Sequence, residues 1–135
     1  MKFIFSLFLI LIFSPIVVIS QIVSPVSELA DEINETSGLI FLENKIITHN
    51  DSGDEPMLYE IDSINGQISR KVVIENAINT DWEDICYDDE YIYIGDFGNN
   101  YGNRTDLKVY KISRSDYFNN DTVTAVVIKF SYKEQ

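Results

Sequence analysis

An internal repeat after residue 36 restricts the fold of this chain more than any other feature. Short runs with strand-like alternation form two sets of four, and no apolar run has helical spacing. The expected strands are 38–42, 45–49, 57–62 and 67–74 in the first set, and 84–87, 91–96, 107–112 and 123–132 in the second. The sets align about 45 residues apart, which is typical of four-stranded β-propeller blades. The matched triplets are Ser37-Gly38-Leu39 with Glu83-Asp84-Ile85, His49-Asn50-Asp51 with Ile94-Gly95-Asp96, and Tyr59-Glu60-Ile61 with Val109-Tyr110-Lys111.

The predicted fold class is therefore all-β: a β-propeller fragment of two four-stranded antiparallel blades after a signal peptide. Asn65-Gly66 predicts a two-residue hairpin turn within the first blade, because both positions tolerate positive φ. A single eight-stranded sandwich or barrel is the alternative. The expected divisions are residues 1–20 as signal peptide, 21–36 as a leading segment, 37–80 as the first blade and 81–135 as the second. Within the leading segment, residues 22–26 are expected to pair with the last blade as a closing strand.

The number of blades raises a question of closure. Propellers typically close with 4–8 blades, and this chain supplies two. Either the chain is the front of a longer protein, or several copies close one ring as a homo-oligomer.

The first twenty residues, MKFIFSLFLILIFSPIVVIS, have the pattern of a secretory signal. Lys2 precedes a long apolar run, and Val18 and Ser20 suit the cleavage site before Gln21. A transmembrane anchor is the alternative. Cleavage predicts a secreted or periplasmic protein with no membrane span.

Composition excludes several kinds of partner and site. The chain has 22 acidic and 10 basic residues, a formal net charge of −12, so nucleic acid and anionic lipid are not expected partners. His49 is the only histidine, which excludes a multi-histidine zinc site within this chain. Cys86, the only cysteine, lies in an expected strand and is predicted to be a buried, inert thiol. Trp82 is expected to pack between blades.

Acidic and amide residues gather where the expected strands begin and end. Clustered carboxylates repel one another unless they are protonated, paired or bound to a metal, and oxygen ligands suit calcium. The alternative is that these side chains only stabilise turns. The candidate Ca²⁺ ligands are Glu35, Asp51, Asp81, Glu83, Asp84, Asp96, Asn99 and Asn100.

Four motifs in order resemble a group of secreted bacterial β-propellers, many from Bacteroidetes. They are Glu35-Thr-Ser-Gly-Leu39, His49-Asn-Asp-Ser-Gly53, Asp81-Trp-Glu-Asp-Ile85 and Gly95-Asp-Phe-Gly-Asn-Asn100. The group is similar to the phytase-like and TolB-like six-bladed propellers, and this chain resembles its N-terminal portion only. The resemblance implies that calcium bound by carboxylates positions an anionic substrate.

Three functions are compatible with these features. The first is an exported calcium-associated binding or scaffold module, in the cell envelope or outside the cell, with a small anion or an envelope or extracellular protein as its partner. The second is a calcium-dependent, phytase-like phosphoesterase that needs further blades, with Arg104 as the substrate-binding residue. The third is a protein-interaction module without calcium. The sequence leaves open whether the chain is an enzyme.

Overall fold

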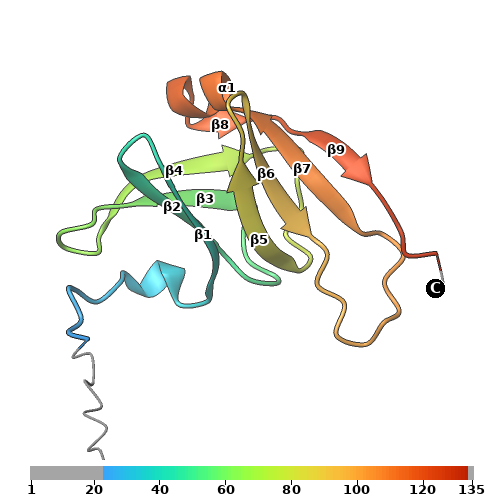
Figure 1. Cartoon of the computed structure of the whole chain (residues 1–135), viewed down its shortest axis with the longest axis horizontal. Coiled ribbons are helices and arrows are strands. Elements are labelled where there is room, and N and C mark those ends of the chain that lie inside the picture. The colour runs from blue at the N-terminus through green and yellow to red at the C-terminus, as the bar shows by residue number, and fades with distance from the viewer. Residues whose placement is uncertain (1–22, 134–135) are drawn as a thin grey trace, which may run out of the picture.

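The computed structural model describes residues 23–133, which form two β-sheets packed face to face (Figure 1). The predicted signal peptide lies outside the described residues. Within residues 23–133, no helix has the length and apolar character needed to cross a membrane.

The first sheet confirms the first set of expected strands. It contains β1 (Thr36–Leu42), β2 (Lys45–Asn50), β3 (Met57–Ile61) and β4 (Ile68–Ile74), each antiparallel to the next. The tight turn between β1 and β2 places Glu43 and Asn44 at φ values of 49° and 60°. Alternation places Ile40, Leu42 and Ile47 in the core between the sheets.

The second sheet contains β5 (Trp82–Tyr87), β6 (Tyr91–Asp96), β7 (Lys108–Ser113) and β9 (Val126–Lys129). All its neighbours pair antiparallel, as expected for this half of the chain. Its first strand, β5, contacts β1, the first strand of the other sheet (Figure 1). The two halves therefore meet along equivalent strands.

The expected long last strand is wrong. Residues after β7 instead form α1 (Arg114–Asn119), β8 (Thr122–Val123) and then β9. The Tyr117 hydroxyl of α1 donates to the carboxylate of Glu60 in β3 at 3.2 Å, and Arg70 of β4 donates to the Tyr117 carbonyl at 2.8 Å. These contacts hold the chain against the first sheet, where β8 pairs parallel with β4. The first sheet is consequently five-stranded and mixed, rather than four-stranded and antiparallel.

The predicted two-residue hairpin at Asn65-Gly66 is also wrong. The link between β3 and β4 is longer, and Asp62 organises it by accepting hydrogen bonds from the Ile64 and Asn65 amides at 2.8 and 3.2 Å. Of the two turn residues, Gly66 alone has a positive φ, at 71°. The local aspartate cap therefore replaces the type I′ turn.

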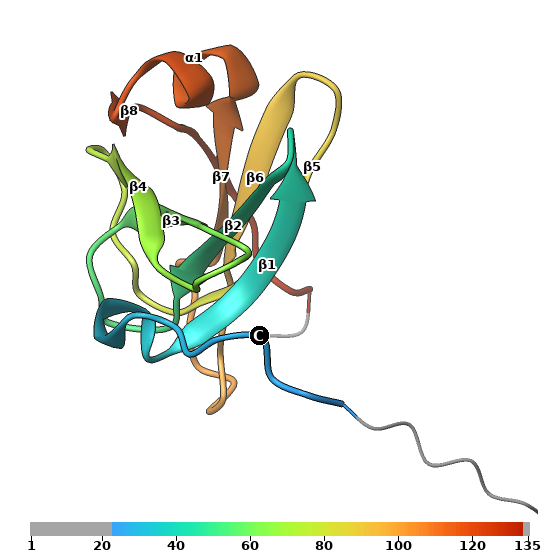
Figure 2. The ribbon, with the colours of Figure 1, turned by 90° about the vertical axis from the view of Figure 1, so that its left-hand side faces the viewer.

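Ala30 and Ile33, in the later part of the leading segment, pack against the outer face of the first sheet. The short 3₁₀-helix η1 (Asp31–Ile33) lies where β1 begins (Figure 2). Ile33 is buried with Tyr59 and Ile61 in a second apolar cluster. Residues 23–30 form no strand here, and Ile22 of the expected closing strand lies outside the described residues.

Cys86 is exposed, so the prediction of a buried thiol is wrong. A β-bulge between Trp82 and Asp84 sets the register of β5, so that Ile85 enters the core and Cys86 lies opposite Tyr93 on the other face. Desolvation, then the charges of Asp84 and Asp88, raise the pKa of the thiol. The thiol is therefore protonated at neutral pH, the state that reacts poorly.

Trp82 packs at the junction of the sheets, as expected. Its indole is fully buried, with an edge-to-face contact to His49 at 5.5 Å between ring centroids and a tilted contact to Tyr110 at 5.8 Å. His49 is also fully buried, and its Nδ1 lies 2.9 Å from the Asn50 carbonyl. Its Nε2 has no hydrogen-bond partner within residues 23–133.

The stability of the fold should fall on mild acidification because of His49. Burial lowers its pKa below the ordinary value of 6.5, and the Asn50 carbonyl and the charges of Asp51 and Asp84 only partly oppose this. The unfolded chain therefore binds more protons than the native one below pH 6.5. We expect the stability that neutral, buried His49 contributes to be complete above pH 6.5. It should be lost as the pH falls from 6.5 to the pKa of His49 in the folded protein. Urea unfolding of wild type and His49→Gln between pH 5 and 8 measures it, and a difference between them that does not change with pH would contradict the account.

Candidate cation site

Two of the expected carboxylates, Asp81 and Glu83, lie over Gly98, and Asp51 lies close enough to act on the charge of both. Asp51 follows β2, Asp81 precedes β5, and Glu83 lies in β5. A Cβ atom at Gly98 would collide with the carboxyl groups of both Asp81 and Glu83. The Gly98 amide donates to the Asp81 carbonyl at 3.1 Å, which fixes the loop beneath the two side chains. A side chain at position 98 would therefore displace the carboxyl groups of Asp81 and Glu83 from this arrangement.

Asn79 joins the two chain segments that supply these carboxylates. Its side-chain nitrogen donates to the carbonyls of Asn50 and Asp51 at 3.1 and 2.6 Å. Its side-chain oxygen accepts from the Trp82 amide at 3.2 Å. Sequence reasoning missed this residue. Its position could have indicated this role, because an asparagine three residues before the start of β5 can accept a hydrogen bond from the Trp82 amide.

The pKa values of Asp81 and Glu83 both lie above their ordinary values. Desolvation, then the negative charge of Asp51, raise the pKa of Asp81, with a smaller opposing effect from Arg104. Desolvation, then the charges of Asp51 and Asp81, raise the pKa of Glu83. The ionised cluster is therefore strained by like charges, and either a proton or a cation would relieve it.

The donor set fits a hard cation in composition, although not yet in spacing. Across the described chain, no group of three or more His, Cys, Asp or Glu side chains has the spacing of a formed metal site. Calcium also takes backbone carbonyls, amide oxygens and water as ligands. Asp51, Asp81 and Glu83 could supply carboxylate oxygens to such a cation only together with further ligands of these kinds.

Asp96 has a different role from the one expected of a ligand. It is fully buried between two cations, with Arg104 Nη2 at 2.8 Å and Lys108 Nζ at 3.1 Å. It also accepts a hydrogen bond from the Asp81 amide at 3.2 Å. Its charge is thus balanced within the fold by Arg104 and Lys108.

Arg104 is likewise occupied by the fold. Besides Asp96, its guanidinium donates to the Gly98 carbonyl at 2.8 Å and to Asp106 at 3.0 Å. Asn99 caps the same loop, because its side-chain oxygen accepts from the amides of Asn103 and Arg104 at 2.9 and 3.0 Å. These residues shape the loop that carries Gly98. Arg104 has little capacity left to bind a substrate anion.

Of the remaining expected ligands, Asp84 and Glu35 line other hollows, whereas Asn100 shares one with Glu83. Asp84 accepts a hydrogen bond from the Ile85 amide at 2.8 Å and lines a separate hollow with Cys86 and Tyr93. Asn100 is exposed, in a hollow that Glu83 also lines. Glu35 contributes its carbonyl to the Asp51 amide at 2.9 Å, while its side chain lines another hollow.

Comparison of the chain with protein-family models, with curated proteins and with solved structures gives no match. The resemblance to secreted propellers therefore remains a prediction from the four motifs, and function is inferred from the site itself.

Proposed function

We propose that this protein is an exported, calcium-associated binding or scaffold module, and that its two sheets are the first blades of a β-propeller. The observation that supports this most is the placement of Asp81 and Glu83 over Gly98, with the negative charge of Asp51 beside both. A calcium ion there would join Asp51, which follows β2 of the first sheet, to Asp81 and Glu83 at the start of the second sheet. It would act as a clamp between the two halves of the repeat.

The propeller part of the proposal rests on the equivalence of the two sheets. The first strands, β1 and β5, contact each other, and each sheet continues outward through its second and third strands. Blades of a propeller are arranged in this way around a channel. The acidic cluster then lies beside the innermost strands, where propellers place binding residues.

A binding role is favoured over phosphoester hydrolysis. A phosphoesterase would need cations free to bind the substrate's phosphate, but Arg104, whose charge acts on Asp81, pairs with Asp96, and so does Lys108. At this cluster an anionic group would therefore reach the protein mainly through the calcium ion. The partner we propose is thus a small anion, or an envelope or extracellular protein that presents a carboxylate or phosphate.

Millimolar calcium should raise the melting temperature of the protein. A ligand at 100 times its Kd stabilises the folded state by about 2.7 kcal/mol, and each kcal/mol raises Tm by roughly 4–8 °C in a domain near this size. The D81N/E83Q variant should lose the calcium effect. In chelator it should melt above wild type, because the repelling charges that raise both pKa values are gone.

Thermal unfolding in calcium and in chelator, followed by circular dichroism, makes the comparison. Glu90→Gln is the matched control, since Glu90 is exposed in the turn before β6 and should keep the full calcium effect. An equal calcium effect in D81N/E83Q and wild type, or none in wild type, would contradict the proposal.

A further inference from the structure

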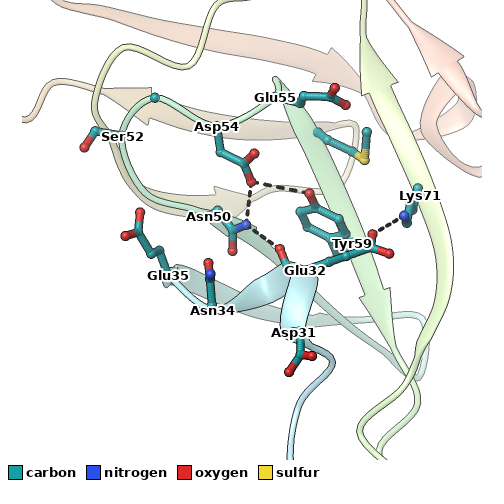
Figure 3. Close-up of a pocket in the computed structure, with 12 residues that line it drawn as sticks. Asp31, Glu32, Asn34, Glu35, Asn50, Ser52, Asp54, Glu55, Tyr59 and Lys71 are labelled. Atoms are coloured by element: carbon teal, nitrogen blue, oxygen red, sulfur yellow. Dashed lines mark hydrogen bonds and ion pairs between the residues drawn. The ribbon is translucent and has the colours of Figure 1, made fainter.

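A second acidic hollow, separate from the cluster over Gly98, opens between η1, the end of β2 and the loop that follows it (Figure 3). Its volume is about 560 Å³, within the roughly 300–1,000 Å³ typical of small-molecule sites. Five carboxylates line it: Asp31, Glu32, Glu35, Asp54 and Glu55. Among the described residues, its one basic lining residue is Lys71, whose ammonium pairs with Glu32. The hollow thus carries an excess of negative charge.

Asn50 provides an independent sign that a ligand belongs there. The residue is only 4% exposed, and its side-chain nitrogen donates to the Glu32 carbonyl at 2.7 Å and to the Asp54 carboxylate. These bonds fix the orientation of the amide, because a flip would place its oxygen against two acceptors. The oxygen is then buried with no donor among residues 23–133. In Figure 3 it points toward the side of the hollow where Asn34 and Glu35 lie.

An unsatisfied buried acceptor is unfavourable by about 1–3 kcal/mol, and buried polar groups in native proteins normally have partners. A ligand that brings an N–H donor into the hollow would satisfy the Asn50 oxygen. The carboxylates around it require that the same ligand be positively charged.

Tyr59 and Met57 add a less polar wall to the hollow. Burial, then the charges of Asp54 and Glu32, raise the pKa of Tyr59 to about 12. The phenol therefore stays neutral, with its hydroxyl 3.5 Å from the Asp54 carboxylate. This less polar wall suits a cation with an aliphatic stem, because the stem packs on the wall while the charge faces the carboxylates.

We infer that this hollow binds an organic cation with N–H donors, an alkylguanidinium or alkylammonium group of side-chain size. The carboxylates come from several segments around the hollow, and a planar guanidinium with N–H donors reaches several acceptors at once. The ligand is either a free small cation or an arginine or lysine side chain of a peptide. The inference does not depend on calcium binding over Gly98.

Isothermal titration of the full-length protein with N-acetyl-arginine amide tests the inference, and N-acetyl-citrulline amide serves as the neutral isostere. The cation should bind at least tenfold more tightly than citrulline amide. The Glu35→Gln and Asp54→Asn variants should each weaken it at least fivefold, and D81N/E83Q should leave it within twofold of wild type. Far-ultraviolet circular dichroism of each variant checks that it is folded.

Two further ligands distinguish the source of the cation. A tripeptide with a central arginine that binds more tightly than the amide would identify a peptide side chain. Spermidine binding more tightly than the amide would identify a free polyamine. Equal affinity for citrulline amide, or an affinity unchanged by both Glu35→Gln and Asp54→Asn, would overturn the inference. An equal loss in D81N/E83Q would also overturn it, because attraction would then be general to the acidic surface.

Discussion

Replacing Trp82 with alanine should lower the free energy of unfolding by about 3–5 kcal/mol, the usual range for removing a buried tryptophan. The indole is fully buried and contacts His49 of the first sheet and Tyr110 of the second. Its removal leaves a cavity at the junction of the sheets. Since domains of this kind are stable by only about 5–15 kcal/mol, much of the fold's stability should be lost.

Urea unfolding followed by far-ultraviolet circular dichroism measures this change, because the variant lacks the fluorescent indole. Tyr101→Ala is the control, since Tyr101 is 92% exposed, and its removal should change stability by less than about 0.5 kcal/mol. A cost below about 1 kcal/mol for Trp82→Ala would show that the two sheets do not share one core.

Replacing Asp96 with alanine should also be severe, at about 3–5 kcal/mol, the range for removing one partner of a buried ion pair. The Asp96 side chain is 0% exposed, and the side chains of Arg104 and Lys108 are 14% and 13% exposed. Without Asp96, these two cations lose their buried partner. The loss should be the same in calcium and in chelator, because Asp96 acts within the fold.

Asp106→Ala is the matched control for Asp96→Ala. Asp106 pairs with the same two cations, but its side chain is 56% exposed, and exposed ion pairs contribute about 1 kcal/mol or less. Chemical unfolding of both variants in calcium and in chelator makes the comparison. If Asp96→Ala destabilises the protein only in calcium, then Asp96 is a ligand of the ion and its assignment as a structural anchor is wrong.

Strand positions could be predicted from the sequence because alternation in each run is local. The exposure of Cys86 could not be predicted in this way, because of the β-bulge in β5. One extra residue in a strand moves the side chains after it to the opposite face of the sheet. The six residues of α1 are too few to establish a 3.6-residue period, and the two residues of β8 are too few to alternate. Both depend on distant contacts, such as that between Tyr117 and Glu60.

Part of the candidate site could likewise be predicted from the sequence, and part could not. The meeting of Asp51 with Asp81 and Glu83 follows from the repeat, because equivalent strands lie side by side. The pairing of Asp96 with Arg104 and Lys108 depends on how the intervening loop folds back. The hollow around Asn50 depends on the leading segment, whose place against the first sheet is set by Ile33 and leaves no periodic signal.

Terbium luminescence tests the central claim, a cation over Gly98, most directly. Terbium accepts the oxygen ligands of calcium, and it emits when a nearby indole transfers its excitation. Trp82 is the only tryptophan and lies between Asp81 and Glu83 in the sequence. We predict sensitised emission that saturates at one ion per chain, is displaced by calcium, and is absent in D81N/E83Q but retained in Glu90→Gln. Emission that is missing in wild type, or equal in wild type and D81N/E83Q, would contradict the account.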